Sequence, residues 1–291
     1  MSSTIWIKST LLLALVAFLL APFTFLKPKP VVEAVKETPS NVQEQKVKPI
    51  VKKMVEKPLH QVNLPDFAAI KDIKTKKQHF FNFIRPSVTG ENAKLLTKRA
   101  KLESWLESIS LGLSLSDEEL TTLAGLVKKY RVNKKASVLQ QVNDLLVRID
   151  IVPTSLVLVQ AANESAWGTS RFSRIGLNFF GIWCYRQGCG MVPGGRNTGA
   201  KHEVAAFKSV DAAVARYFHN LNSHNAYRVF RTIRFELRSQ SQPLNPEILA
   251  TGLLPYSERG ADYVIDITKM LRQNQQYFKN DSAKVEVIAA D

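Results

Sequence analysis

The sequence predicts an α+β fold that is mainly helical, with one small β-hairpin. Apolar residues recur at helical spacing in a series of segments between residues 70 and 271. A glycine- and aromatic-rich stretch between Gly168 and Gly199 breaks this pattern and is typical of loops and a hairpin. The sequence contains neither internal repeats nor long alternating strands.

The first 65 residues are expected to lie outside this fold. Residues 9–26 carry no charge and would span about 27 Å as a helix, close to the hydrocarbon thickness of a bilayer. Residues 1–26 therefore predict a membrane anchor, and we favour an uncleaved anchor over a removed signal peptide or a buried core helix, because no Ala-x-Ala cleavage pattern occurs. Six prolines and eight lysines in residues 27–65 predict a stiff, extended tether.

Helical periodicity follows the tether. The apolar stripe from Ile70 to Ile84 predicts a helix that Pro86 should end, and a second stripe runs from residue 95 to 109. Ser116 and Glu119 form a capping box that should open a third helix. Further helices are expected over 138–149, from Pro153 to about Glu164, from Ser209 to Leu221, from Asn245 to Gly252, and around 264–271. We expect the apolar stripes of these helices to form the core.

The two cysteines, Cys184 and Cys189, lie close together in the glycine-rich stretch. In an exported domain this spacing predicts a local disulfide, worth about 2 kcal/mol by loop-closure entropy. The alternative is a pair of ordinary thiols. No histidine lies at zinc-ligand spacing with the pair, so we expect no metal and no other cofactor.

The net charge of +15 predicts an anionic partner, such as nucleic acid, an anionic membrane surface or an acidic polymer. About ten of the surplus positive charges lie after residue 65, so the folded part is itself basic. The sequence has no helix-turn-helix signature, zinc finger or aromatic RNP motif. Nucleic acid is therefore not expected as a partner.

Glu164 lies at the C-terminal end of an apolar helix, where the helix dipole disfavours a negative charge. If Trp167, Phe179 and Phe180 also exclude water, the pKa of this carboxyl should rise toward neutrality. A protonated carboxyl of that kind can act as general acid for a glycosidic oxygen. The alternative is an ordinary solvated glutamate near a helix end.

A family resemblance favours the catalytic interpretation. The segment Gln160-Ala-Ala-Asn-Glu164-Ser-Ala-Trp-Gly168, followed by Asn178-Phe-Phe-Gly-Ile182, resembles the fingerprint of glycoside hydrolase family 73. The resemblance covers about residues 65–275 and implies a lysozyme-like fold over 66–275, with 276–291 as a C-terminal tail. It also implies a β-N-acetylglucosaminidase that cleaves the backbone of bacterial peptidoglycan without a cofactor.

The resemblance implies roles for particular residues. The general acid falls on Glu164. The family often has a second carboxylate on a hairpin, for which Glu203 is the candidate, with a salt bridge to Lys201 or Arg196 as the alternative. A tyrosine-bearing segment of the family corresponds to Tyr256 or Tyr263. The expected substrate-binding residues are Ser165, Trp167, Asn178, Trp183 and Tyr185, with backbone hydrogen bonding as the alternative for Ser165 and Asn178, and core packing for Trp183.

Three functions are therefore compared. The favoured one is an endo-β-N-acetylglucosaminidase at the periplasmic face of a bacterial inner membrane, or in the periplasm if the signal is cleaved. Its partners would be peptidoglycan strands and the inner membrane, and the sequence identifies no protein partner. The alternatives are a peptidoglycan-binding module with little or no turnover, suggested by the missing acid on the first hairpin strand, and a muramidase or lytic transglycosylase on the same scaffold.

Overall fold

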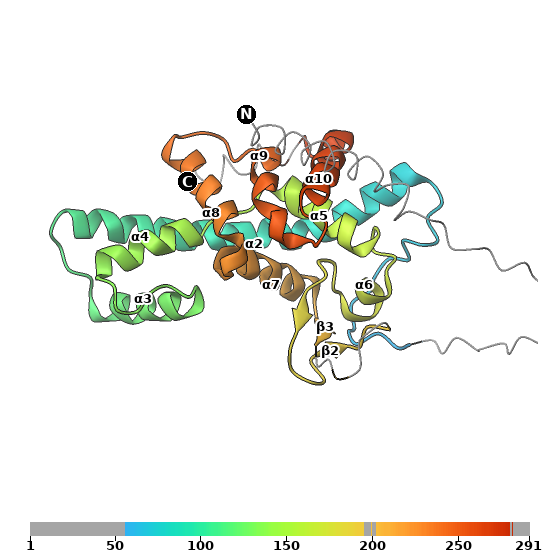
Figure 1. The fold of residues 1–291 in the computed structure, drawn as a ribbon, viewed down its shortest axis with the longest axis horizontal. Coiled ribbons are helices and arrows are strands. Elements are labelled where there is room, and N and C mark those ends of the chain that lie inside the picture. The colour runs from blue at the N-terminus through green and yellow to red at the C-terminus, as the bar shows by residue number, and fades with distance from the viewer. Residues whose placement is uncertain (1–55, 195–198, 200–201, 280, 282–291) are drawn as a thin grey trace, which may run out of the picture. The chain divides into compact units, whose positions relative to one another are not determined.

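The computed structural model describes residues 56–194, 199, 202–279 and 281 (Figure 1). The chain separates into two compact units, Met1–Lys53 and Met54–Asp291, and all described residues belong to the second. The predicted membrane anchor and the tether up to residue 55 lie outside the described residues. Of the helices that are described, none is long and apolar enough to cross a membrane. Helices dominate and are joined by one small antiparallel sheet, which confirms the α+β class.

The first described helix, α2 (Ile73–Ser110), runs through Pro86, so the predicted break there is wrong. Pro86 lies on the exposed side of the helix, and the Thr89 hydroxyl donates to the carbonyls of Arg85 and Pro86, at 3.1 Å each. The opposite side is buried over several turns, which outweighs the local cost of the proline. Ile73 is 69% exposed and does not join the core as predicted, whereas Ile70, before the helix, packs against it. The buried residues of α2 are Phe80, Phe81, Ile84, Val88, Asn92, Leu95, Leu102 and Trp105.

The next two helices, α3 (Asp117–Lys129) and α4 (Val138–Arg148), form as predicted. In the capping box, the Ser116 amide donates to the Glu119 carboxylate at 2.9 Å, and the Glu119 amide donates to the Ser116 hydroxyl at 3.4 Å. Leu120 and Val138, in the first turns, remain partly exposed instead of joining the core. The predicted stripes are therefore buried only from the second turn onward.

The helix α5 (Thr154–Ser165) is the buried helix of the domain and contacts α2, α9 (Pro246–Ala250) and α10 (Ala261–Gln273). Residues 156–162 are all fully buried, so α5 is enclosed on every side. It begins directly after Pro153, as predicted. Its C-terminal end positions Glu164.

The second half of the chain adds α7 (Val210–Ser223), α8 (Arg228–Ser239) and three short 3-10 helices, η1 (Asn225–Tyr227), η2 (Thr251–Tyr256) and η3 (Gln275–Tyr277). The helix α8 was not predicted from the sequence. Gly252 does not end the helical segment that starts at Asn245, because the chain continues as η2 to Tyr256. At Gly252 an added Cβ would lie 2.4 Å from the Phe230 Cα, so this close crossing explains the glycine.

Arginines of α8 form an ion cluster with Asp150, which is 2% exposed. The Asp150 carboxylate accepts hydrogen bonds from Arg238 at 2.9 and 3.0 Å and lies 3.5 Å from a guanidinium nitrogen of Arg99. Arg234 is fully buried and donates to the carbonyls of Asp150 and Ile151 at 3.2 and 3.0 Å. This cluster joins α8 to the segment that leads into α5.

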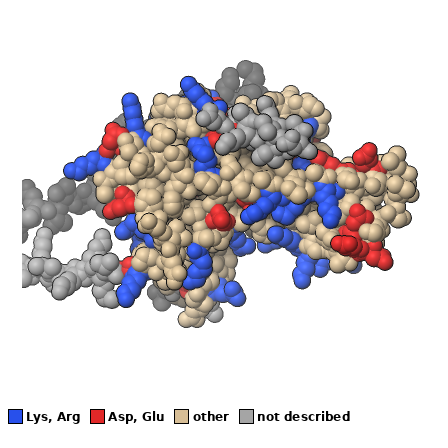
Figure 2. Space-filling view, turned by 180° about the vertical axis from the view of Figure 1, so that it is seen from behind, with Lys and Arg blue, Asp and Glu red and all other residues tan. Residues whose placement is uncertain are grey.

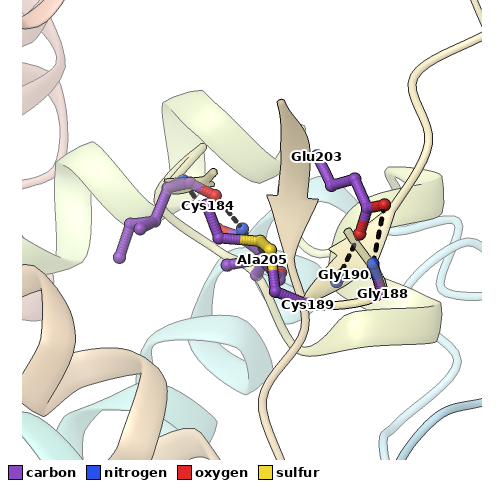
Figure 3. Close-up of a disulfide and its surroundings, with 8 residues drawn as sticks. Cys184, Gly188, Cys189, Gly190, Glu203 and Ala205 are labelled. Carbon is purple, nitrogen blue, oxygen red and sulfur yellow. Dashed lines mark hydrogen bonds between the residues drawn. A yellow bond between two sulfur atoms is a disulfide. The ribbon is translucent and has the colours of Figure 1, made fainter. Parts of the chain in front are cut away.

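Three short strands, β1 (Trp183–Cys184), β2 (Gly190–Met191) and β3 (Glu203–Ala205), pair antiparallel in the order β1-β3-β2. The predicted hairpin near Met191 is present, with Met191 opposite Val204, and β1 extends it. A short helix that was not predicted, α6 (Arg171–Gly176), precedes the sheet. The predicted disulfide between Cys184 and Cys189 is confirmed and closes the loop between β1 and β2 (Figure 3).

Candidate active site

A left-handed turn ends α5 one residue after Glu164. Ala166, Trp167 and Gly168 have φ angles of 49°, 59° and 77°. The Ser165 hydroxyl donates to the Ala161 carbonyl at 2.6 Å and accepts from the Gly168 amide at 2.9 Å. Because of this turn, the chain changes direction after Ser165, and the Glu164 carboxyl lies at the C-terminal end of α5.

The Glu164 carboxyl is half-buried, and close neighbours define its position. The Asn163 side-chain amide donates to Oε1 at 3.2 Å. On the other side, a Cβ added to Gly181 would lie 3.5 Å from Oε2, so the carboxyl faces the backbone of this glycine. Burial raises the pKa of Glu164, while hydrogen bonds from Asn163 and Tyr263 and the charge of Arg259 partly oppose the rise. A carboxyl in this environment holds its proton at a higher pH than a solvated glutamate does.

The structure distinguishes the two candidate tyrosines. Tyr263, on α10, is 1% exposed, and its hydroxyl accepts a hydrogen bond from the Gln160 side-chain nitrogen at 2.9 Å. Hydrogen bonding from Tyr263 lowers the pKa of Glu164 against the effect of burial. Tyr256 stacks on Tyr263, with ring centroids 5.5 Å apart, and donates to the Phe180 carbonyl at 2.8 Å. Tyr263 therefore acts on the carboxyl directly, whereas Tyr256 supports the backbone beside Gly181.

Four further residues of the site were not assigned to it from the sequence. Gln160 accepts a hydrogen bond from the Tyr217 hydroxyl, and Tyr217 stacks on Phe180 at 4.3 Å. Burial, followed by the nearby charge of Glu164, raises the pKa of Tyr227 to about 12. Arg259 is the fourth, since its charge acts on Glu164. Gln160 belongs to the quoted fingerprint, and Tyr217 was assigned only to an apolar stripe.

Trp167 and Phe179, which were expected to exclude water from Glu164, pack against α2. Trp167 packs edge-on against Phe80 and Phe81 of α2, at centroid distances of 5.8 and 5.2 Å, and Lys77 covers its ring. Phe179 also packs on Phe80, at 6.2 Å. Both aromatic side chains thus pack on the core against α2, and the role of Trp167 in substrate binding stays a prediction that these contacts do not support.

Glu203 has a clear role in the backbone of the sheet. It is 4% exposed, and its two carboxylate oxygens accept hydrogen bonds from the amides of Gly188 and Gly190, at 2.9 Å each (Figure 3). These bonds tie the disulfide-closed loop to β3. This geometry favours a structural role, and the catalytic role of Glu203 stays a prediction that these contacts do not support. Its alternative partners, Lys201 and Arg196, lie outside the described residues.

The other predicted substrate-binding residues divide into two groups. Ser165 and Asn178 are 0% and 2% exposed, which favours the alternative of backbone hydrogen bonding, and their assignment to substrate binding stays a prediction that this burial does not support. Asn178 instead donates to the carbonyls of Ile182 and Ala205, at 2.8 and 2.9 Å, which shapes the turn before the sheet. Trp183 and Tyr185 are 43% and 80% exposed. Their faces are available for stacking on sugars, and this role stays a prediction.

Within the described residues, Cys184, Cys189 and Glu203 bring possible metal-ligand atoms together. Because the two sulfurs are bonded to each other, they offer no thiolate to a metal. A cavity of about 570 Å³ between α2 and the segment 276–281 is lined by Asn82, Arg85 and Tyr277, among others, and shares no residue with the surroundings of Glu164. Neither this cavity nor the cysteine pair therefore defines the candidate active site, which is identified by the contacts of Glu164.

Comparison with known proteins points to the same part of the chain. A family model described as mannosyl-glycoprotein endo-beta-N-acetylglucosaminidase, a glucosaminidase domain, matches residues 139–277. Protein bax of Escherichia coli (strain K12) is 33% identical over 215 residues, which cover 74% of this chain and 75% of that protein. No solved structure matches significantly. The matched region contains Glu164, all four tyrosines of its surroundings, and the sheet.

Proposed function

Because the chain belongs to the glucosaminidase family of glycoside hydrolases, we propose that it is an endo-β-N-acetylglucosaminidase in which Glu164 is the general acid. The observation that carries this proposal is the placement of Glu164. It is a half-buried carboxyl with a raised pKa, at the end of a rigid helix, and is contacted by a buried tyrosine. Such a group can hold a proton near the pH at which a glycosidic bond must be cleaved.

In the proposed reaction, protonated Glu164 donates to the leaving glycosidic oxygen as positive charge builds on the anomeric carbon of N-acetylglucosamine. Asn163 and Tyr263 hold the carboxyl in place through their hydrogen bonds. After the bond breaks, the same two donors stabilise the carboxylate that remains. We assign no residue to the opposite face of the sugar, because both oxygens of Glu203 bind backbone amides.

We propose bacterial peptidoglycan as the substrate. Its stem peptides carry free carboxylates, and the net charge of +15 would raise the local concentration of such a polymer at low salt. In the view of Figure 2, Lys and Arg side chains are spread over much of the visible surface, whereas Asp and Glu are densest at the right-hand end, with separate acidic patches elsewhere. Exposed Trp183 and Tyr185 would add stacking contacts to the sugars.

Residues 1–26 would tether the enzyme to the inner membrane on its periplasmic side. Their support is the uncharged run of membrane length near the start of the chain. A protein of the full chain length in the membrane fraction would agree with an uncleaved anchor. A shortened, soluble periplasmic form would show that the segment is removed as a signal.

The experiment that tests the proposed activity is digestion of purified sacculi, followed by mass spectrometry of the new chain ends. The proposal predicts fragments with N-acetylglucosamine at the reducing end. Reducing N-acetylmuramic acid would identify a muramidase, and 1,6-anhydro ends would identify a lytic transglycosylase. Binding to sacculi without new ends would indicate a module without turnover, and each of these three results contradicts the proposal.

A further inference from the structure

A chain of hydrogen bonds leads from the interior of the domain to Glu164. The Tyr217 hydroxyl donates to Oε1 of Gln160, and Nε2 of Gln160 donates to the Tyr263 hydroxyl at 2.9 Å. Hydrogen bonding from Tyr263 in turn lowers the pKa of Glu164. The partners are far apart in sequence, and Gln160, Tyr217 and Tyr263 are each at most 1% exposed. Water therefore does not replace any of these partners.

The side-chain amide of Gln160 gives this chain a direction. An amide oxygen can only accept and an amide nitrogen can only donate, so Tyr217 must donate to Gln160, and Tyr263 must accept from it. The one proton of the Tyr263 hydroxyl is then left for Glu164. If the amide of Gln160 were turned around, Tyr263 would donate to the amide oxygen, and Glu164 would lose a donor.

Building on the proposed function, we infer that Gln160 is a positioning residue whose buried amide orients the Tyr263 hydroxyl so that it donates to the carboxyl of Glu164. Tyr217 favours this orientation, because turning the amide would take away the Gln160 oxygen that accepts the proton of the buried Tyr217 hydroxyl. The ring of Tyr217 is in turn held by stacking on Phe180. Gln160 thus acts on the proton donor through one intervening tyrosine and does not touch the substrate.

The consequence for the chemistry is a limit on how firmly Glu164 holds its proton. A hydrogen bond donated to a carboxylate stabilises the ionised form and so opposes the effect of burial. Without it, the carboxyl would be a weaker acid and would transfer its proton less readily. By orienting the Tyr263 hydroxyl, Gln160 therefore limits how far burial raises the pKa of Glu164, so that the carboxyl can still give up its proton.

The groups that act on Glu164 come from several elements. They are Tyr217 on α7, Tyr227 on η1, Tyr256 on η2, Tyr263 on α10 and Arg259 before α10. Burial raises the pKa of each of these tyrosines, so all four stay neutral around neutral pH. A titration near or below neutral pH in this cluster therefore reports Glu164 itself.

The test measures the pKa of Glu164 in the full-length protein by NMR of ¹³C-labelled glutamate side chains, with Glu164→Gln used to assign the signal. The pH profile of kcat/KM is recorded on the same samples. Tyr263→Phe should raise the pKa of Glu164, and move the alkaline limb of the profile upward, by about one pH unit. Gln160→Met leaves the Tyr263 hydroxyl in place but removes the amide that orients it, and should shift both in the same direction by a smaller amount. Tyr217→Phe frees the amide to turn and should shift both in the same direction by a smaller amount.

A double variant separates positioning from a general disturbance of the core. Gln160→Met should cause no further shift when Tyr263 is already Phe, because its effect passes through that hydroxyl. Two control variants, Gln141→Met on α4 and Tyr130→Phe at the end of α3, remove a side-chain amide and a tyrosine hydroxyl elsewhere in the domain. They should leave the pKa of Glu164 unchanged. If Gln160→Met does not fold, Tyr217→Phe in the wild-type and Tyr263→Phe backgrounds supplies the same comparison.

Two results would overturn the inference. One is an equal shift from Gln160→Met, or its Tyr217→Phe substitute, with and without the Tyr263 hydroxyl. The other is a lower rate at every pH with an unchanged pKa of Glu164, which is the effect of a purely structural defect. If the wild-type protein proves inactive, the proposed function fails, and the NMR titration still decides the role of Gln160.

Discussion

Replacing Asp150 by Asn should lower the free energy of unfolding by about 3 kcal/mol at neutral pH, the lower end of the cost of breaking a buried ion pair. Asp150 is the acidic centre of an interior cluster of three arginines, and Arg234 beside it is fully buried. The amide of Asn fills the same space but leaves the charge of Arg234 without a counterion. The cost stays at the lower end because Arg234 keeps its hydrogen bonds to backbone carbonyls, including those of Ile151 and Arg148.

This cost should depend on pH in a defined direction. Burial alone would raise the pKa of Asp150, but Arg234, Arg238 and Arg99 together lower it below the usual value. The stabilisation is then fully present above the unfolded pKa of about 3.9 and is lost as the pH falls through the lower folded pKa. The difference between wild type and Asp150→Asn should therefore narrow below about pH 4.

Urea unfolding of both proteins, measured between pH 3 and pH 7, provides the assay. Exposed Asp211, in the first turn of α7, serves as the control, and Asp211→Asn should cost less than about 1 kcal/mol. A cost below about 1 kcal/mol for Asp150→Asn, or a difference that is constant down to pH 3, would refute the assigned role of the ion cluster.

Three further outcomes follow from the site and the sheet. Gly190→Ala should disrupt the pairing of β2 with β3, because the alanine Cβ would lie 1.9 Å from the Val204 carbonyl oxygen. Hydrogen exchange should then show a loss of amide protection in β3, and unchanged protection would contradict the prediction. Replacing Cys184 and Cys189 by Ser should lower stability by about 2 kcal/mol in urea unfolding, and no loss would speak against the loop-closure argument. The alkaline limb of the kcat/KM profile should lie above the ordinary glutamate pKa of about 4.3, because burial raises the pKa of Glu164. An alkaline limb at or below that pH would contradict the assignment of Glu164 as general acid.

Local patterns predicted much of the helical framework. The capping box at Ser116, the stripe of α4 and the start of α5 at Pro153 each depend on residues within one or two turns, so sequence spacing is sufficient to find them. The disulfide was predictable for the same reason, since Cys184 and Cys189 are five positions apart. These features are set by short-range geometry.

The features that were missed depend on contacts between distant parts of the chain. The helix α8 buries Arg231 and Arg234, which an apolar stripe does not reveal, and Arg234 donates to carbonyls in the segment 147–151 and to Asn222 on α7. The continuation of α2 through Pro86 is stabilised by packing on the opposite face. Both cases show tertiary structure overriding a local preference.

In the candidate site, too, the features set by local sequence were predicted and those set by distant contacts were missed. The fingerprint located Glu164, and the end of α5 places it as expected. By contrast, the bonds of Gln160 to Tyr217 and Tyr263 join residues 57 and 103 positions apart, which no local pattern predicts. Ser165 and Asn178 belong to the same fingerprint, and their buried hydrogen bonds to backbone carbonyls shape the chain around the site.

The central claim is that the carboxyl proton of Glu164 cleaves the glycan backbone, and the most direct test counts new reducing ends released from sacculi by wild type and by Glu164→Gln. An exposed residue on α8, Glu236, supplies the matched control Glu236→Gln. We predict that wild type and the control release ends at the same rate, and that Glu164→Gln, although folded, is slower by about a hundredfold or more. Wild-type turnover in the folded Glu164→Gln variant would contradict the account.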